Sequence, residues 1–349
     1  MRGLRYGSGD ELVAVRRVVA LAEIISLLVG GLAVAGWAGV AKAAGEPPAG
    51  QARFSGTFLQ LDGGNAAWSA EEWDEEFRAM QQAGMSLVIV QWAATPAYVY
   101  YPSDSLPGHQ PSPAPLDLIM AAAEKYGFSV LLGPYLDERW WSQYMREEFV
   151  AEQLAITARV AAELYARYGS SPAFAGWYLP YEINATPLFT TAGRRRAGEL
   201  LRRATGVFHR LTPDRPVTIA PFFDRILPVG FCESWWKEVL TGSGVDTVFL
   251  QDGVGTDRGI SPEIAGRYFA AFERATAAAG VKLWSDLEIF VQATWQPAPW
   301  ERIEAQLQAE APYVEGFVIF EFNHYMSPVR GGKAAELYAA YDRYIGGQK

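Results

Sequence analysis

Short, continuously apolar runs alternate with longer stretches of helical spacing along residues 54–349. Leu87–Val90 is apolar throughout, as strands that are buried on both faces are. Runs of this kind recur eight times, and we interpret each of them as a buried strand. The predicted strands span Ser55–Leu61, Leu87–Trp92, Ser129–Pro134, Phe174–Tyr181, Val217–Pro221, Thr247–Gln251, Val281–Leu287 and Gly316–Phe322.

A helix is predicted after each of these strands. The first helix begins with a capping box, because Ser69 stands at the N-cap position and Glu72 follows three residues later. Its apolar residues Trp73, Phe77 and Met80 recur at helical spacing. The predicted helices span Ala70–Ala83, Leu116–Tyr126, Arg146–Tyr168, Thr191–Leu211, Glu233–Leu240, Ser261–Ala279, Pro299–Ala311 and Lys333–Ile345.

Strict alternation of strand and helix predicts a parallel sheet. Eight such units over about 300 residues, with no ninth strand, predict a single (β/α)8 TIM barrel, which is an α/β fold. The alternative is an open, doubly wound sheet, which favours a glycine-rich turn after its first strand. Asp62–Asn65 lacks the G-x-G-x-x-G pattern, and the next helix begins too far along the chain. We therefore predict the barrel.

The first 43 residues have a different pattern from the rest of the chain. Arg16 and Arg17 precede a long apolar stretch, Val18–Val40, and Ala41–Ala43 matches the small-x-small pattern of a cleavage site. This arrangement predicts a cleaved signal peptide over residues 1–43. An uncleaved membrane anchor is the alternative, since about 20 apolar residues can span a bilayer.

In both cases the protein is expected to be exported, as a periplasmic, secreted or membrane-anchored protein facing outside. Residues 44–53, rich in proline and glycine, read as a short linker, and residues 54–349 as the barrel domain. Cys232 is the only cysteine, so the exported chain has no internal disulfide and depends on its core for stability.

The composition narrows the class of ligand. The formal net charge is −9 and no basic stripe is visible, which argues against a nucleic acid as the partner. The chain contains 12 Trp and 17 Tyr. Such residues fill cores, and in loops they also stack on the C–H faces of sugar rings. We expect a monomer.

The active site of a TIM barrel lies at the rim formed by the C-terminal ends of its strands. The polar and aromatic residues that the predicted strands place near this rim are Gln60, Asp62, Gln91, Trp92, Tyr135, Asp137, Tyr181, Glu182, Asn184, Phe222, Asp224, Gln251, Asp252, Trp284, Asp286, Glu288, Glu321, Asn323 and His324. The set contains no lysine, which disfavours a Schiff-base aldolase, and no phosphate-cradling glycine turn follows the last two strands. Carboxylates, amides and aromatic rings suit a neutral, polyhydroxylated ligand, so we expect a carbohydrate substrate.

Metal ligands are scarce in the sequence. The three histidines, His109, His209 and His324, have none of the spacings of a zinc site. We therefore expect no metal and no cofactor. A barrel that uses an oxygen-ligated Ca²⁺ or Mg²⁺ for lyase chemistry remains a weaker alternative, because carboxylates are plentiful.

Two glutamates, Glu182 and Glu288, follow the fourth and seventh predicted strands and should face the same rim. Glycoside hydrolysis needs one protonated and one ionised carboxyl group, so this pair is the predicted catalytic pair. Carboxyl groups about 5–5.5 Å apart give retention, and a wider spacing gives inversion; the sequence leaves this choice open.

The remaining polar residues are predicted to bind the substrate or to support the pair. The expected substrate-binding residues are Gln60, Gln91, Trp92, Tyr135, Tyr181, Asn184, Trp284, Glu321 and Asn323. Glu321 is also a rival for the role of Glu288, either as the nucleophile or as a group that orients it. Asp286, two residues before Glu288, is expected to lie beside the catalytic pair and to influence it without contacting the substrate.

Three segments, Gly56–Trp92, Gly176–Asn184 and Ser285–Phe290, resemble domain-of-unknown-function family 4434. The first is the most specific: a strand with Gln, then W-s-x-x-x-W on the first helix, then a strand that ends in Gln-Trp. The resemblance covers about Phe54–Ile345 and implies a glycosidase-like TIM barrel.

A broader resemblance to retaining glycosidase barrels implies Glu182 as acid/base and Glu288 as nucleophile. Those enzymes usually carry Asn directly before the first of these acids, whereas Tyr181 stands there in this chain and Asn184 comes later. A glycoside hydrolase is therefore the leading hypothesis, and a non-catalytic carbohydrate-binding or scaffold barrel of the cell envelope is the alternative.

Overall fold

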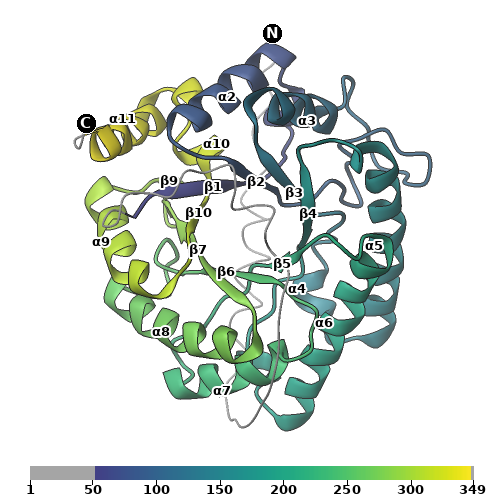
Figure 1. Ribbon diagram of the computed structural model, residues 1–349, viewed down its shortest axis with the longest axis vertical. Coiled ribbons are helices and arrows are strands. Elements are labelled where there is room, and N and C mark those ends of the chain that lie inside the picture. Colours follow the sequence, from purple (N-terminus) through teal and green to yellow (C-terminus); the bar gives the residue numbers. More distant parts are fainter. Residues whose placement is uncertain (1–51, 347–349) are drawn as a thin grey trace.

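The computed structural model describes residues 52–346, which form one closed barrel surrounded by helices (Figure 1). The barrel strands lie in the order β1-β10-β7-β6-β5-β4-β3-β2. Their bounds are β1 Phe54–Leu59, β2 Leu87–Val90, β3 Ser129–Leu132, β4 Phe174–Leu179, β5 Val217–Ile219, β6 Thr247–Gln251, β7 Lys282–Glu288 and β10 Phe317–Phe320. The predicted α/β TIM barrel is confirmed.

Eight longer helices form the outer ring in Figure 1. They are α2 Ala70–Gln82, α3 Pro115–Tyr126, α5 Glu147–Tyr168, α6 Thr191–Leu211, α7 Val229–Leu240, α8 Pro262–Ala279, α9 Trp300–Glu310 and α11 Gly332–Gly346. Shorter pieces sit in the loops: η1 Asn65–Ala67, α4 Trp140–Gln143, η2 Thr186–Leu188, β8 Phe290–Val291, β9 Gln296–Pro297, η3 Ala311–Tyr313, α10 Phe322–Tyr325 and η4 Pro328–Arg330.

Closure of the barrel depends on β1, which pairs in parallel with both β2 and β10. Thr57 is the register partner of Val88 on one side and of Ile319 on the other. The other neighbouring barrel strands also pair in parallel. All strands therefore point the same way, and their C-terminal ends meet at one rim.

The strand residues divide into two apolar layers, as the period of two along a strand requires. Inside the barrel, one cluster includes Phe58, Ile89, Leu131 and Phe249. A larger cluster fills the space between the strands and the helices, and it includes Val88 and Val130, the neighbours of inward-facing residues. The interior is thus a packed core below the rim rather than a channel.

Two details of the elements differ from the sequence prediction. The helix predicted over Glu233–Leu240 begins earlier, at Val229, directly after Pro228. The sequence also indicated no strand beyond the eight, but β8 and β9 form a small antiparallel hairpin after β7. Strands of two residues are too short to produce an alternation pattern. The predicted capping box of α2 is present, with Ser69 and Glu72 bonded reciprocally.

The predicted signal peptide or anchor, residues 1–43, lies outside the described residues, as do residues 44–51 of the predicted linker. Within residues 52–346, none of the helices is both long enough and apolar enough to cross a membrane.

Candidate active site

An open cavity lies at the C-terminal rim of the barrel, with about 400 Å³ of empty space. Its lining consists of residues at or beside strand ends: Phe58, Gln91, Tyr178, Glu182, Ala220, Gln251, Asp286, Glu288, Phe290 and Phe320. Three of these residues carry carboxyl groups, and aromatic rings form much of the remaining wall. Glu182 and Glu288, which the sequence placed on separate strands, thus line the same cavity.

The alternation of β7 places two acids on the cavity side. Asp286 and Glu288 line the cavity, whereas the intervening Leu287 belongs to the outer apolar layer. Ser285 also faces outward, where its hydroxyl donates a 2.6 Å hydrogen bond to Glu310 of α9. Asp286 and Glu288 are two residues apart on one strand, so their side chains point to the same side of the sheet.

Glu182 comes from the loop that follows β4. Trp140 Nε1 donates a 2.9 Å hydrogen bond to the Glu182 carbonyl oxygen and fixes the backbone of this loop. Burial of the carboxyl group raises the pKa of Glu182 to about 7, although Arg258 and a hydrogen bond with Gln251 act to lower it. Glu182 is thus suited to hold a proton near neutral pH.

Glu288 ends β7 and is 5% exposed. Burial and the nearby charge of Asp252 raise the pKa of Glu288 to about 8, and Arg258 acts in the opposite direction. The backbone N–H of Gly255 donates a 2.7 Å hydrogen bond to Glu288 Oε2. Arg302 Nη2 donates a 2.6 Å hydrogen bond to the Glu288 carbonyl oxygen. Both the side chain and the backbone of Glu288 are therefore held.

Asp286 is the most isolated acid of the cavity. It is 2% exposed, and its Oδ1 atom has no hydrogen-bond partner among the described residues. Burial and the charges of Glu288, Asp252 and Glu182 raise the pKa of Asp286 well above its ordinary value. A buried polar atom without a partner costs free energy, so this oxygen is available to a ligand that enters the cavity.

A second layer of buried acids lies behind Glu288. Asp252 Oδ1 accepts a 2.9 Å hydrogen bond from the Val254 N–H, and Asp252 Oδ2 accepts one from Gln306. Burial raises the pKa of Asp252 to about 6. Glu310 stands beyond it, fully buried, and burial raises the pKa of this group well above its ordinary value. Burial thus favours the protonated form of both acids more than it would be favoured in exposed carboxyl groups.

Among the predicted substrate-binding residues, Gln91 lines the cavity, and its Oε1 atom has no partner among the described residues. Tyr181 does not line it. The Tyr181 hydroxyl lies 2.6 Å from Thr157 Oγ1 in α5, and its ring stacks on Trp140 at 4.3 Å between centroids. Asn184 also turns away, because its Nδ2 donates a 3.3 Å hydrogen bond to Asp224 Oδ2.

Three more predicted residues are placed in the packing around the cavity. Trp284 lies inside the barrel against Phe249, with ring centroids 6.0 Å apart, and is not among the cavity residues. Trp92 packs against the outer apolar layer. Tyr135 is 5% exposed, and burial raises the pKa of its hydroxyl to about 12.

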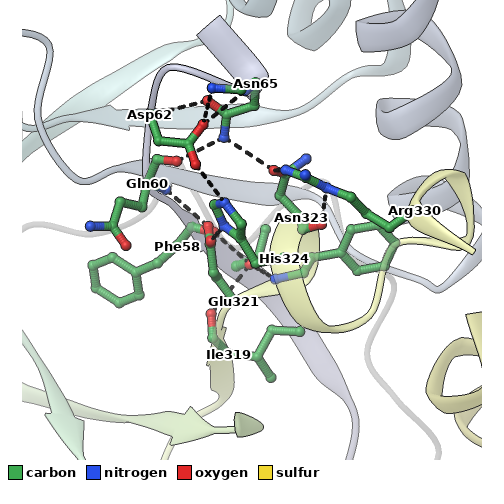
Figure 2. A network of polar contacts seen from close by, with 12 residues as sticks. Phe58, Gln60, Asp62, Asn65, Ile319, Glu321, Asn323, His324 and Arg330 are labelled. Carbon is green, nitrogen blue, oxygen red and sulfur yellow. Dashed lines mark hydrogen bonds and ion pairs between the residues drawn. The ribbon is translucent and has the colours of Figure 1, made fainter. Parts of the chain in front are cut away.

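Glu321 belongs to a separate polar network at the edge of the barrel (Figure 2). Its carboxylate is fully buried, accepts a 2.9 Å hydrogen bond from the Gln60 N–H and contacts His324 Nδ1. The Gln60 side chain points away from this carboxylate in Figure 2. His324 Nε2 lies 3.1 Å from Asp62 Oδ2. Glu321 thus has its own partners, and it is not among the cavity residues.

The charges of this network explain its arrangement. Burial alone would lower the pKa of His324, but the charge of Glu321 and the bonds to both carboxylates raise it to about 10. Burial would also raise the pKa of Asp62, yet its bonds, with His324 foremost, lower it to about 2. A charged imidazolium therefore sits between two carboxylates. Asn323 belongs to the same region. Its Nδ2 donates a 2.8 Å hydrogen bond to Glu76 Oε1, and Arg330 Nη2 donates a 2.6 Å hydrogen bond to Asn323 Oδ1 (Figure 2).

Arg258 is a residue of the site that no sequence pattern indicated. It lies in the loop between β6 and α8, with its guanidinium 4.5 Å from the centroid of the Phe222 ring and 3.5 Å from Asp224 Oδ1. Its positive charge lowers the pKa of both Glu182 and Glu288. A loop arginine has no strand period that would indicate where it points.

The residues near the cavity do not form an evident metal centre. Within residues 52–346, no group of three or more His, Cys, Asp or Glu side chains is placed to hold a metal ion. The arrangement instead provides carboxyl groups with raised pKa values, one amide oxygen without a partner and aromatic walls.

A family model described as "Domain of unknown function (DUF4434)" matches residues 54–331. The chain belongs to the DUF4434 family. The match spans the barrel from β1 to the turn before α11. The resemblance of Gly56–Trp92 and of the two strand-end segments to this family is thereby confirmed.

Three solved structures that share this barrel are described as glycoside hydrolases. A proposed alpha-L-fucosidase from Bacteroides thetaiotaomicron VPI-5482 is 24% identical, with a TM-score of 0.73 over 84% of this chain and 96% of that chain. The endo-1,4-beta-D-mannanase from Thermotoga petrophila RKU-1 is 12% identical, with a TM-score of 0.55 over 84% and 99%.

The beta-galactosidase from Marinomonas ef1 is 11% identical, with a TM-score of 0.55 over 83% of this chain and 59% of that chain. At these identities the likeness shows that this DUF4434 protein has a glycosidase-like barrel fold. Among curated proteins, none matches the chain significantly.

Proposed function

We propose that this DUF4434 protein hydrolyses glycosidic bonds of an oligosaccharide or polysaccharide in the cavity at the barrel rim. The observation that carries the proposal is the convergence of Glu182 and Glu288, from β4 and β7, on one cavity with aromatic walls. Hydrolysis of an acetal needs an acid for the leaving oxygen and a second carboxylate on the other side of the anomeric carbon.

Glu182 acts as the acid in this proposal. Burial raises its pKa to about 7, so a large fraction is protonated near neutral pH. Its proton passes to the glycosidic oxygen as the bond to the anomeric carbon breaks. The same group, now ionised, can take a proton from the water molecule that completes the reaction.

Glu288 is the second carboxylate. Its pKa of about 8 would by itself favour a protonated group. Burial and the charge of Asp252 are the causes of this shift. The Gly255 N–H at 2.7 Å stabilises the ionised form, and Arg258 and Arg302 act in the same direction. These groups equip Glu288 to attack the anomeric carbon or to activate a water molecule.

Asp286 and Gln91 are proposed to bind the sugar rather than to react. Each has a buried oxygen without a partner among the described residues, and both line the cavity. A sugar hydroxyl can donate a hydrogen bond to either oxygen. Binding would thereby give both oxygens a hydrogen-bond partner.

A carbohydrate-binding barrel without catalysis is the second candidate. It is favoured by Asn184, whose amide bonds to Asp224 instead of reaching the cavity beside Glu182. In this case the neutral carboxyl groups would serve only as hydrogen-bond partners for hydroxyls.

A panel of polysaccharides and oligosaccharides, incubated with the wild-type protein and with Glu182→Gln, separates the two candidates. Hydrolysis by the wild type that is lost in Glu182→Gln, with an unchanged unfolding temperature, supports the enzyme. Tight binding of a glycan that neither protein cleaves would favour the binding barrel and contradict hydrolysis.

A further inference from the structure

Trp295 is an exposed aromatic residue beside the cavity. It is 41% exposed, and no other tryptophan within residues 52–346 is exposed to this degree. It lies in the turn between β8 and β9, the hairpin that follows the strand ending in Glu288. An exposed indole ring is a large, flat apolar surface of the kind that stacks on sugar rings.

Trp295 is connected to the cavity through one ring. Its indole stacks on Phe290, with ring centroids 5.4 Å apart and an interplanar angle of 17°. Phe290 itself is 6% exposed and lines the cavity beside Glu288. The aromatic wall of the cavity therefore continues outward onto an exposed ring.

The backbone of Trp295 is in a conformation that a tryptophan rarely adopts. Its φ angle is 51°, in the left-handed region, and it is the only non-glycine residue with positive φ within residues 52–346. Turns that need this conformation favour glycine or asparagine. A bulky side chain at such a position costs free energy that a role for the ring would explain.

The hairpin that carries Trp295 is held in place. The Gln292 N–H donates a 2.8 Å hydrogen bond to the Gly255 carbonyl, and Gln292 Oε1 accepts a 3.0 Å hydrogen bond from the Asp257 N–H. The Trp295 N–H bonds to the Val291 carbonyl at 2.7 Å. The indole is thus presented from a fixed position, which lowers the entropy cost of binding.

We propose that Trp295 forms a second sugar subsite, which stacks a neutral pyranose ring of a glycan chain as the chain leaves the cavity past Phe290. The inference rests on the proposed function and specifies its substrate as a chain rather than a single sugar. The cavity is open to solvent, and its empty space of about 400 Å³ includes part of that solvent, so a glycan of several sugar units extends beyond it. A flat apolar ring at the exit fits the C–H face of a pyranose.

The test measures affinity against chain length in the Glu182→Gln background, where no substrate is consumed. The probes are gluco-, manno- and fuco-oligosaccharides of one to six units, and binding is followed by calorimetry. We expect an increase in affinity of about tenfold at the length that first reaches Trp295. Adding Trp295→Ala should remove this increase and leave the affinity for shorter glycans unchanged, while Trp295→Tyr should keep most of it.

Two control variants show whether the loss of affinity comes from the Trp295 ring itself. Tyr165→Ala removes another exposed ring, 39% exposed, that packs on Phe174 at the start of β4, away from the C-terminal rim; it should keep the increase. Trp295→Gly relieves the backbone conformation and should keep the wild-type unfolding temperature. A clear fall in the unfolding temperature of Trp295→Gly, together with weaker binding of all glycans, would show a packing role and overturn the subsite.

The outcomes separate this inference from the proposed function. If glycans bind and the increase with length survives Trp295→Ala, the subsite is wrong and the cavity remains a sugar site. If no glycan binds to the wild-type protein or to Glu182→Gln, both the subsite and the proposed function are wrong.

Discussion

The backbone N–H of Gly255 donates a 2.7 Å hydrogen bond to Glu288 Oε2, which joins the loop after β6 to the acid at the end of β7. A Cβ atom at Gly255 would lie 2.8 Å from Glu288 Cβ and 2.9 Å from Glu288 Oε2, closer than real side chains approach. The glycine therefore allows the contact, and the contact favours the ionised form of Glu288.

Gly255→Ala tests this relationship. The added methyl group should displace the Glu288 carboxyl group, lower kcat/KM about 100-fold and cost about 1–3 kcal/mol of unfolding free energy. Gly230→Ala is the matched control, because a Cβ atom at Gly230 meets nothing within 4 Å. Steady-state kinetics and thermal unfolding check both variants, and wild-type activity in Gly255→Ala would contradict the role of the contact.

Asp286 should make stability depend on pH. Its pKa is raised by burial and by neighbouring acids, so the folded state holds a proton that the unfolded state releases above about pH 4. Folding stability must then fall as the pH rises, by up to about 1.4 kcal/mol per pH unit for one such group.

Asp286→Asn removes this group while keeping its shape, so the variant should be stabilised relative to the wild type more at pH 8 than at pH 5. Denaturant unfolding at both pH values measures the difference. Equal effects of the substitution at the two pH values would show that Asp286 is not a protonated buried acid.

Arg258 should set the pH range of the reaction. Its charge lowers the pKa of both Glu182 and Glu288, so Arg258→Met should move both limbs of the pH profile of kcat/KM to higher pH. Arg202→Met on the exposed surface of α6, whose guanidinium pairs with Glu199, is the control that should leave the profile in place. An unchanged profile for Arg258→Met would mean that this arginine acts on neither glutamate.

Much of the fold could be read from the sequence because the strands are buried on both faces. Leu87–Val90 and the centre of Thr247–Gln251 stand out as apolar runs, and the second of these strands ends at Gln251 in both the prediction and the structure. The position of Glu288 on the cavity side follows from the same period of two. That Glu182 and Glu288 lie at the same rim could therefore be predicted from strand order, because each follows the end of a strand.

The rest of the site depends on loops, where no period applies. β4 ends at Leu179, so Tyr181 and Glu182 lie on a loop, and Tyr181 turns outward to stack on Trp140. Arg258 reaches the glutamates from the loop between β6 and α8. Glu321 has its own partner, His324, because α10 begins directly after it and brings that side chain back. Such contacts are set by tertiary packing, which a single sequence does not display.

The most direct test of the central claim compares Glu182→Gln, Glu288→Gln and the double variant on a glycan that the wild type cleaves. If the two acids act as one unit in one cavity, each single variant should lose about 10³-fold or more in kcat, and the double variant should be little worse than the poorer single one. All three should keep the wild-type fold by circular dichroism. Full activity in both single variants would contradict the account.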